Sequence, residues 1–515
     1  MTLTRRTMLR LLGGAVVAAP LLSACAAEGS TGILVPSGAP LPDPFGVPLP
    51  VPPVLTPTRT DDTTDYYEIT QRAADVEILP GLTTEVWGYN GVFPGPTLET
   101  RLGRRVVVRQ RNELPVPVAV HLHGGVNPAE HDGYPTDLIL PVGGWEPDPE
   151  HVAHYPAGDT SQDEREYVYP LEQRACTLWY HDHRMDFTGP QVYRGLAGFH
   201  ILRDGAEDAL GLPGGERDIP LMICDRSFAE DGSFDYPSLD PSLGGVPGVG
   251  EEMMEGVLGD VILVNGAPWP YLEVSDTRYR FRVLNASNAR RYQLLLDPPP
   301  ASGPSFVQIG SDVGLLGAPI EHDQIEIASA ERFDVVIDFS AYPVGTEVTL
   351  VNAYGTETTR PVMRFHVVRE ETDDSVIPDR LVEFETLDPA TAVVERDFRF
   401  ARDRIDGARM WTINGRPFDP ERIDADPVLG SVEIWRLRTN VHHPVHLHMA
   451  HFQVLTRNDR TPGPYDAGWK DTIDLAGGEE AEIIIRFSGH TGRYVFHCHN
   501  LEHEDMMMMA NFQVH

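Results

Sequence analysis

From about residue 60 to its end, the chain consists of short apolar stretches separated by glycine, proline and asparagine. β-Branched and aromatic residues predominate in these stretches, which is typical of strands joined by turns. The clearest predicted strands are residues 105–111, 280–284, 333–339 and 481–487. No long segment shows the 3.6-residue period of an amphipathic helix. The pattern therefore predicts an all-β protein made of sandwiches or barrels.

A turn motif that begins with Asn-Gly and contains a proline occurs three times along the chain, at Asn90, Asn265 and Asn414. Each copy leads through a predicted strand to a second asparagine, 22, 20 and 26 residues further on. The first and last copies then reach a histidine, whereas the middle copy has Gln293. Such a repeat predicts three β-sandwich domains, at residues 59–205, 216–370 and 395–515. Only the two outer domains can then supply histidine ligands.

Histidines gather in four strand-like motifs: His121-Leu-His123, His181-Asp-His183, His443-Pro-Val-His446-Leu-His448 and His497-Cys-His499. Because side chains alternate along a strand, each His-x-His pair points to one face, as a shared metal cluster requires. Cys498 would point to the opposite face, so that a single strand could serve two metal sites. Electrons that reach Cys498 would then have a short covalent path to His497 and His499.

A thiolate combined with imidazoles and a weak thioether is the ligand set of a blue copper centre. Cysteine and histidine alone also suit zinc, and a buried thiol beside structural histidines is a further alternative. Four histidine pairs, two in each outer domain and one of them enclosing a cysteine, favour copper.

The four motifs, together with Phe93-Pro-Gly-Pro-Thr97, resemble the copper signatures of the multicopper oxidases. The resemblance runs from about residue 60 to the C-terminus and includes residues 279–288, 309–316 and 468–472. It is strongest to the branch of bacterial spore-coat laccases and bilirubin oxidases. The resemblance implies an all-β chain of three cupredoxin-like Greek-key β-sandwich domains that bind four copper ions.

The resemblance also implies a role for individual residues. The type 1 copper ligands would be His443, Cys498, His503 and Met508, the type 2 ligands His121 and His446, and the type 3 ligands His123, His181, His183, His448, His497 and His499. His442 is a rival to His443, and Met507 and Met509 are rivals to Met508. Glu504 and Asp132 match positions of a proton relay in this branch, although acidic residues are abundant in this chain and both could be ordinary surface groups.

The implied activity is laccase-like: one-electron oxidation of phenolic or similar organic donors, coupled to reduction of O2 to water. A second interpretation is a metallo-oxidase that acts on Cu(I) or Mn(II), suggested by Met253-Met254 and Met506–Met509. A third is a non-catalytic copper-binding electron carrier, and a zinc hydrolase is a distant fourth. The expected partners are therefore O2 and a small reductant: a phenol, a bilirubin-like compound or a metal ion.

Charge narrows the range of partners. The chain has 41 Lys+Arg against 77 Asp+Glu, a net charge of -36, which argues against nucleic acid and anionic membrane surfaces. Lys470 is the only lysine. Apart from Cys25 and Cys498, the chain contains Cys176 and Cys224, which are either buried thiols or one disulfide.

The N-terminus predicts export. Arg5 and Arg6 precede a short apolar run at residues 11–22, which resembles a twin-arginine signal. Residues 1–25 end in Leu22-Ser-Ala-Cys25, which resembles a lipoprotein cleavage box and would make Cys25 a lipid anchor, although an ordinary signal cleaved nearby is an alternative. The proline-rich residues 26–58 predict an extended tether. The expected location is extracytoplasmic, with membrane contact only through the lipid.

Overall fold

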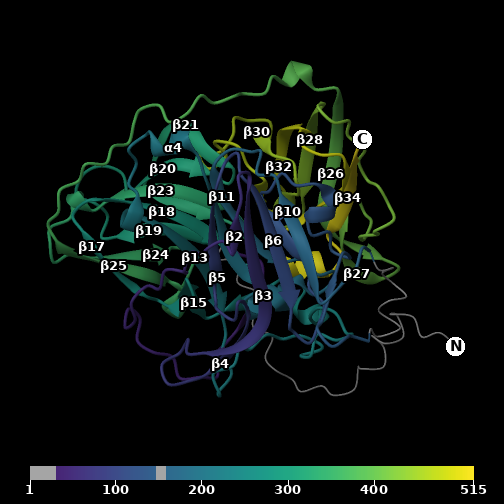
Figure 1. Cartoon of the computed structure of the whole chain (residues 1–515), viewed down its shortest axis with the longest axis horizontal. Coiled ribbons are helices and arrows are strands. Elements are labelled where there is room, and N and C mark those ends of the chain that lie inside the picture. The colour runs from purple at the N-terminus through teal and green to yellow at the C-terminus, as the bar shows by residue number, and fades with distance from the viewer. Residues whose placement is uncertain (1–29, 147–157) are drawn as a thin grey trace.

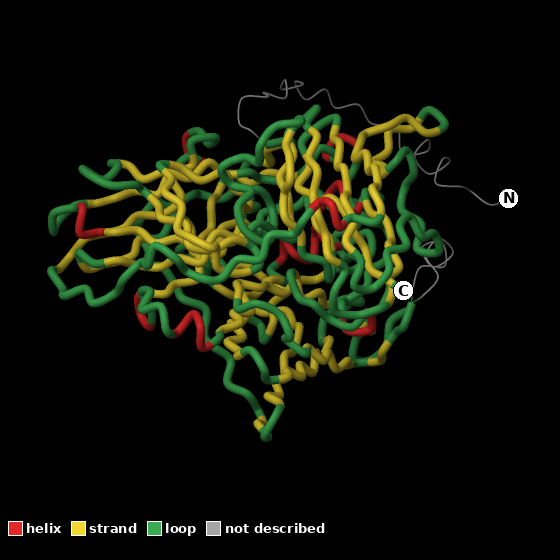
Figure 2. The backbone as a smooth tube through the Cα atoms, turned by 90° about the horizontal axis from the view of Figure 1, so that it is seen from above, coloured by secondary structure: helices red, strands yellow, loops and turns green. Residues whose placement is uncertain are grey.

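The computed structural model describes residues 30–146 and 158–515 of the chain. Figure 1 shows three β-rich units: residues 59–203 in the centre, 218–369 on the left and 394–514 on the right. Seen from above, the molecule is elongated, and its helices are short compared with its strands (Figure 2). The predicted all-β class is confirmed, and the four strands expected from the apolar pattern all form.

The first unit consists of two facing sheets. One contains β2 Arg59–Thr60, β3 Thr64–Val76, β4 Thr84–Tyr89, β6 Arg105–Asn112 and β10 Glu164–Tyr169. The other has the order β5-β12-β11-β7 and is formed by β5 Gly95–Arg101, β7 Val120–His123, β11 Cys176–Asp182 and β12 Ala197–Arg203. A small two-stranded sheet adds β8 Ile139–Leu140 and β9 Ser161–Gln162.

The second unit pairs a seven-stranded with a five-stranded sheet. The larger sheet comprises β13 Asp218–Arg226, β15 Val261–Val264, β16 Ala267–Pro268, β18 Arg278–Asn285, β20 Phe306–Ser311, β21 Gly314–His322 and β23 Arg332–Asp338. The smaller sheet comprises β17 Tyr271–Ser275, β19 Tyr292–Asp297, β22 Gln324–Ile327, β24 Glu347–Asn352 and β25 Pro361–Arg369. Residues 370–393 then run along the top of the molecule in Figure 1 to the third unit.

The third unit repeats the two-sheet plan. One sheet contains β26 Val394–Ile405, β27 Ala408–Ile413, β28 Val432–Thr439, β30 Phe452–Arg457 and β32 Glu480–Arg486. The other has the order β31-β29-β33-β34 and contains β29 His443–Leu447, β31 Thr472–Leu475, β33 Gly492–Cys498 and β34 Met509–Val514.

Over residues 30–146 and 158–515, helices are confined to connections between strands. The α-helices of the described residues are α3 Thr188–Arg194, α4 Gly205–Asp208 and α5 Leu501–Asp505, and the 3-10 turns are η1 Ala129–His131, η2 Gly215–Arg217, η3 Glu251–Met253, η4 Phe339–Ala341, η5 Glu357–Thr359 and η6 Pro389–Thr391. None of the helices in the described part of the chain is long and apolar enough to cross a membrane.

The asparagine repeat has a common structural cause. Asn90, Asn265 and Asn414 all have positive φ, 58°, 50° and 53°, a conformation that asparagine tolerates better than most residues. In each unit the side-chain oxygen of this asparagine accepts a hydrogen bond from a main-chain N–H of an early strand, at 2.8–2.9 Å. The motif therefore fixes the same turn against the same part of each sandwich.

The proline-rich segment is packed against the protein and is not a free tether over its described residues. Strand β1 Ile33–Val35 pairs in parallel with β14 Val257–Gly259. Further on, the N–H groups of Phe45 and Leu49 donate to carbonyl oxygens of the second unit, and that of Leu55 donates to Thr97 of the first. Proline favours an extended backbone, as expected, but composition does not show which surface such a segment covers.

A buried ionic cluster joins the first two units. Its cations are Arg203, Arg280 and Arg282, and its anions are Glu207, Asp218 and Asp334. One oxygen of Glu207, in α4, accepts hydrogen bonds from Arg280 at 2.6 Å and from Arg282 at 2.7 Å. The other two carboxylates complete the pairing, so that three positive charges meet three negative charges.

The described cysteines Cys176, Cys224 and Cys498 are free and buried. Cys176 and Cys224 therefore form no disulfide, and burial raises the pKa of these two thiols to about 12 and about 11. Residues 1–29, with the proposed signal and Cys25, lie outside the described residues.

Candidate metal centre

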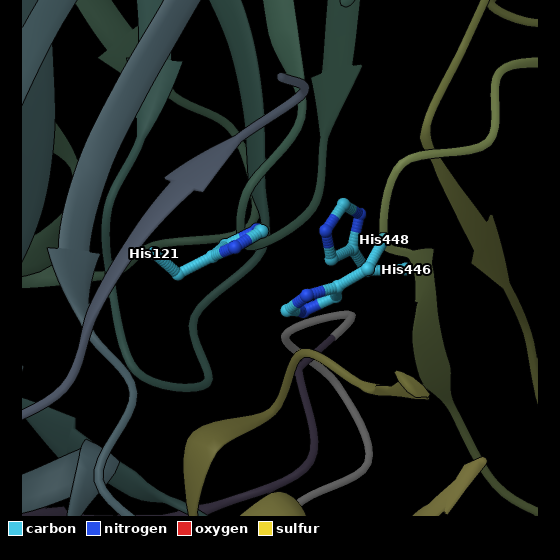
Figure 3. A group of neighbouring side chains, drawn as sticks. All are labelled: His121, His446 and His448. Atoms are coloured by element: carbon cyan, nitrogen blue, oxygen red, sulfur yellow. The ribbon is translucent and has the colours of Figure 1, made fainter. Parts of the chain in front are cut away.

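Two pairs of adjacent strands bring the four histidine motifs together. In the first unit, β7 and β11 pair with His121 opposite His181. In the third unit, β29 and β33 pair with His446 opposite His497. Figure 3 shows His121 from one side facing His446 and His448 from the other. Several groups of described residues have possible metal-ligand atoms within 4.8 Å of one another, and one group consists of His121, His446 and His448. None of these groups includes a residue of 218–369.

The hydrogen bonds of four buried rings leave one bare nitrogen on each. The Nδ1 atoms of His121, His181 and His446 lie 2.6–2.9 Å from main-chain oxygens, and Nε2 of His123 lies 3.1 Å from the Asp471 carboxylate. Because carbonyl and carboxylate oxygens can only accept, these nitrogens carry the proton of the neutral ring. The opposite nitrogens, which are buried and have no hydrogen-bond partner, are therefore lone pairs available to a metal.

A second set of rings converges on one point. Nε2 of His497 lies 3.2 Å from Nε2 of His183 and 3.2 Å from Nε2 of His448. Burial lowers the pKa of His183 to about 4 and lowers that of His448 well below its usual value, so these rings are neutral near pH 7. At this separation the three Nε2 atoms can hold a metal cation between them.

Two buried carboxylates hold the outer edges of these rings. The Asp132 carboxylate accepts a hydrogen bond from Nδ1 of His448 at 2.7 Å, and the Asp132 carbonyl accepts one from His121. The Glu504 carboxylate lies 3.2 Å from Nδ1 of His497 and 3.6 Å from Nδ1 of His183. Both carboxylates are at most 2% exposed, so neither is an ordinary surface acid.

The pKa values of these two carboxyl groups shift in opposite directions. Burial raises the pKa of Asp132 well above its usual value. Burial acts in the same direction on Glu504, but His183 and His497 outweigh it and hold the pKa of this carboxyl well below the usual value. Thr188 also donates to Glu504, at 2.7 Å.

On the other side of β33, a separate group contains the thiol. Nδ1 of His443 lies 3.3 Å from Sγ of Cys498 and 3.1 Å from Nδ1 of His503, and Sγ of Cys498 lies 3.5 Å from Nδ1 of His503. All three residues are fully buried. Burial also raises the pKa of the Cys498 thiol well above its usual value, so that a cation is needed to hold the sulfur as a thiolate.

The structure separates the candidates that compete for this group. The His442 ring is hydrogen-bonded to Asp474 and lies outside the group around Cys498. Met508 packs in the same apolar cluster as Cys498, whereas Met507 and Met509 pack in another cluster, around Tyr134. This arrangement favours His443 and Met508 over their rivals.

Residues that the motifs did not identify complete the surroundings. The indole of Trp411 lies over the His503 ring at a centroid distance of 3.8 Å and donates from Nε1 to the carbonyl of Met254. Nε2 of His503 lies 3.2 Å from the carbonyl oxygen of Glu255. The sequence pointed to one further residue beside the cluster, Asp471, because it lies in residues 468–472, which resemble the family.

The donor set fits copper in both centres. The centre around Cys498 offers a thiolate and the imidazoles of His443 and His503 in a buried, nearly triangular arrangement. This is the trigonal geometry of a blue copper site. The histidine cluster offers three groups of three buried imidazoles: His121, His446 and His448; His121, His123 and His181; and His183, His448 and His497. Imidazole suits copper, and the two centres are joined through the backbone of Cys498 to His497 and His499.

Comparison with known proteins agrees with this chemistry. Family models described as multicopper oxidase match residues 70–207 and 393–515. The chain belongs to the multicopper oxidase family. Family membership implies four copper ions, one of type 1, one of type 2 and two of type 3, as predicted, and the β-sandwich units are cupredoxin-like.

Several of the similar proteins are laccases or bilirubin oxidases, as the sequence predicts. The chain is 38% identical to a laccase of Bacillus stratosphericus, with 90% of this chain and 98% of that protein aligned. It is 37% identical to a bilirubin oxidase of Albifimbria verrucaria, with 91% and 81% aligned. A crystal structure of a laccase from Pediococcus acidilactici matches with a TM-score of 0.78 and 31% identity, covering 94% of this chain and 95% of that one.

Proposed function

We propose that this protein couples the one-electron oxidation of phenolic or similar organic donors to the four-electron reduction of O2 to water. The observation that supports this most directly is Cys498, which lies in one buried ligand group while its neighbour His497 lies in the other. A simple electron carrier has no use for a second centre. Similarity to laccases and a bilirubin oxidase supports organic donors over metal ions.

In this proposal His443, Cys498, His503 and Met508 hold the type 1 copper, His121 and His446 the type 2 copper, and His123, His181, His183, His448, His497 and His499 the type 3 pair. Bound copper supplies one-electron redox chemistry at the centre around Cys498 and four-electron chemistry towards O2 at the histidine cluster.

The protein's own groups perform the remaining tasks. Cys498 connects the two centres through the covalent chain to His497 and His499. Glu504 and Asp132, which contact the outer nitrogens of the cluster histidines, hold these rings in place and are positioned to pass protons inward. Thr188, hydrogen-bonded to Glu504, extends this path by one group.

Oxygen uptake by the copper-loaded protein tests the proposal. The donors are a methoxyphenol, bilirubin, Cu(I) and Mn(II), compared by kcat/KM. We expect the organic donors to be preferred, because Met254 is buried in an apolar cluster and Met253 packs against another, where they act as core residues. A preference for either metal ion would assign the protein to metal homeostasis instead.

We also propose export by the twin-arginine route and a lipid on Cys25, on the strength of the N-terminal sequence. Because the Ser30 hydroxyl already accepts a hydrogen bond from the main-chain N–H of Arg291, four residues separate Cys25 from the folded protein. These four residues span roughly 13–14 Å when fully extended. An enzyme anchored in this way would lie close to the membrane surface. The Cys25→Ala variant tests the anchor.

A further inference from the structure

Asp471 touches one imidazole on each side of the cluster. Its carboxylate lies 3.1 Å from Nε2 of His123, in the first unit, and its carbonyl oxygen lies 2.9 Å from Nδ1 of His446, in the third. These two rings stack with centroids 3.6 Å apart and bare nitrogens on their inner edges. A single residue thus sets the tautomer and the orientation of two rings from different units.

Arg332, in the second unit, holds Asp471 through both oxygens of the carboxylate. Nη1 donates to Oδ1 at 2.7 Å and Nη2 donates to Oδ2 at 2.5 Å. Such a bidentate hydrogen bond fixes the plane of the carboxylate as well as its position. Both side chains are at most 1% exposed, so solvent does not weaken the pair.

The remaining donors of Arg332 are also used. Nε donates to the carbonyl of Thr177 in β11, Nη1 to Ala330 and Nη2 to Asp312, at 2.9–3.0 Å. A guanidinium has five N–H groups, and all five are hydrogen-bonded here. Their acceptors belong to the first, second and third units, so the position of this one side chain is determined by all three.

The main chain next to the cluster leaves room for this pair. Gly124, which follows His123, has φ of +83°, and a Cβ atom there would lie 2.7 Å from Oδ2 of Asp471 and 2.8 Å from Nη2 of Arg332. The glycine after the first histidine motif therefore serves close packing of the Arg332–Asp471 pair against the ligand strand, in addition to the turn.

We propose that the middle unit, which supplies none of the grouped ligand side chains, positions the histidine cluster through Arg332 acting on Asp471. Asp471 and Arg332 are positioning residues, which act by keeping His123 and His446 aimed at their metals. Loss of such an outer partner typically weakens metal affinity by about 10–100-fold.

The Asp471→Asn and Arg332→Lys variants test this in the full-length, copper-loaded enzyme. The amide introduced by Asp471→Asn has one acceptor oxygen and cannot accept both hydrogen bonds from Arg332. The ammonium introduced by Arg332→Lys keeps the charge but cannot make five fixed hydrogen bonds. We expect both variants to retain the blue absorption of the Cys498 centre. Copper per chain should fall from four to three or fewer after dialysis against a graded series of chelator concentrations.

Asp225→Asn is the matched control. Asp225 is as deeply buried, but its carboxylate accepts from Arg290 at 2.8 Å and from the main chain of Gly259 at 2.7 Å, rather than from a cluster histidine. The control should lower stability without releasing copper. The proposal is overturned if Asp471→Asn or Arg332→Lys keeps four copper ions at wild-type chelator resistance, or if Asp225→Asn loses copper to the same extent. Arg332→Lys retains the buried positive charge, so it decides the question if Asp471→Asn does not fold.

Discussion

The buried cluster between the first two units predicts a specific dependence of stability on pH. Glu207 accepts hydrogen bonds from Arg203, Arg280 and Arg282. Burial alone would raise its pKa, but the three guanidinium groups outweigh burial and lower the pKa from 4.5 to about 2. A difference of about 2.5 pKa units corresponds to about 3 kcal/mol of stability.

The sign follows from proton uptake. Between pH 4.5 and pH 2 the unfolded chain protonates Glu207 while the folded protein keeps the carboxylate ionised, so acid favours unfolding. The contribution of Glu207 is therefore fully present above pH 4.5 and is lost as the pH falls to about 2. Replacement by glutamine imitates the protonated form at every pH.

The measurement compares urea unfolding of the wild type and the Glu207→Gln variant at several values between about pH 2 and pH 6. Urea is uncharged and does not screen the cluster. We expect the variant to be less stable by about 3 kcal/mol at about pH 6 and equally stable near pH 2. Asp374→Asn, at an exposed ion pair with Arg217, should change little at any pH. A deficit of Glu207→Gln that is independent of pH would refute the reasoning.

Three further predictions concern the copper chemistry and the location. Glu504→Gln should lower turnover by about 100-fold or more while the blue absorption is retained, as measured by oxygen uptake and a visible spectrum; unchanged turnover would argue against a relay. Cys498→Ser should abolish the visible band and lower the copper content by one ion, and a variant that stays blue would contradict the thiolate assignment. Cys25→Ala should release the protein into the medium, whereas continued retention in the membrane fraction would exclude the lipid anchor.

The sequence was most informative where the chemistry is local. Alternation along a strand was enough to separate Cys498 from His497, because neighbouring side chains must point to opposite faces. The choice of His443 over His442 came from motif spacing, and the structure favours it, since His442 is occupied by Asp474. The asparagine turns likewise carry their conformation in a few adjacent residues.

Contacts between distant segments could not be predicted in this way. His123 and Asp471 are 348 positions apart, and neither periodicity nor composition indicates that they meet. The same applies to the proline-rich segment, whose extended form is local but whose docking on the second unit depends on tertiary structure. Arg332 lies in an ordinary apolar strand, and only the assembled units show that all five of its N–H groups are used.

Lys470, the only lysine of the chain, is 1% exposed and paired with Asp312 and Glu331, at 3.2 Å and 3.1 Å. The described surface thus has no lysine amine for reagents such as activated esters or aldehydes to modify. Attempts to fix this protein on an electrode or a resin through lysine would fail while the fold is intact. Coupling through the abundant surface carboxylates is the practical route, and modification of Lys470 would serve instead as a sensitive chemical signal that the third unit has opened.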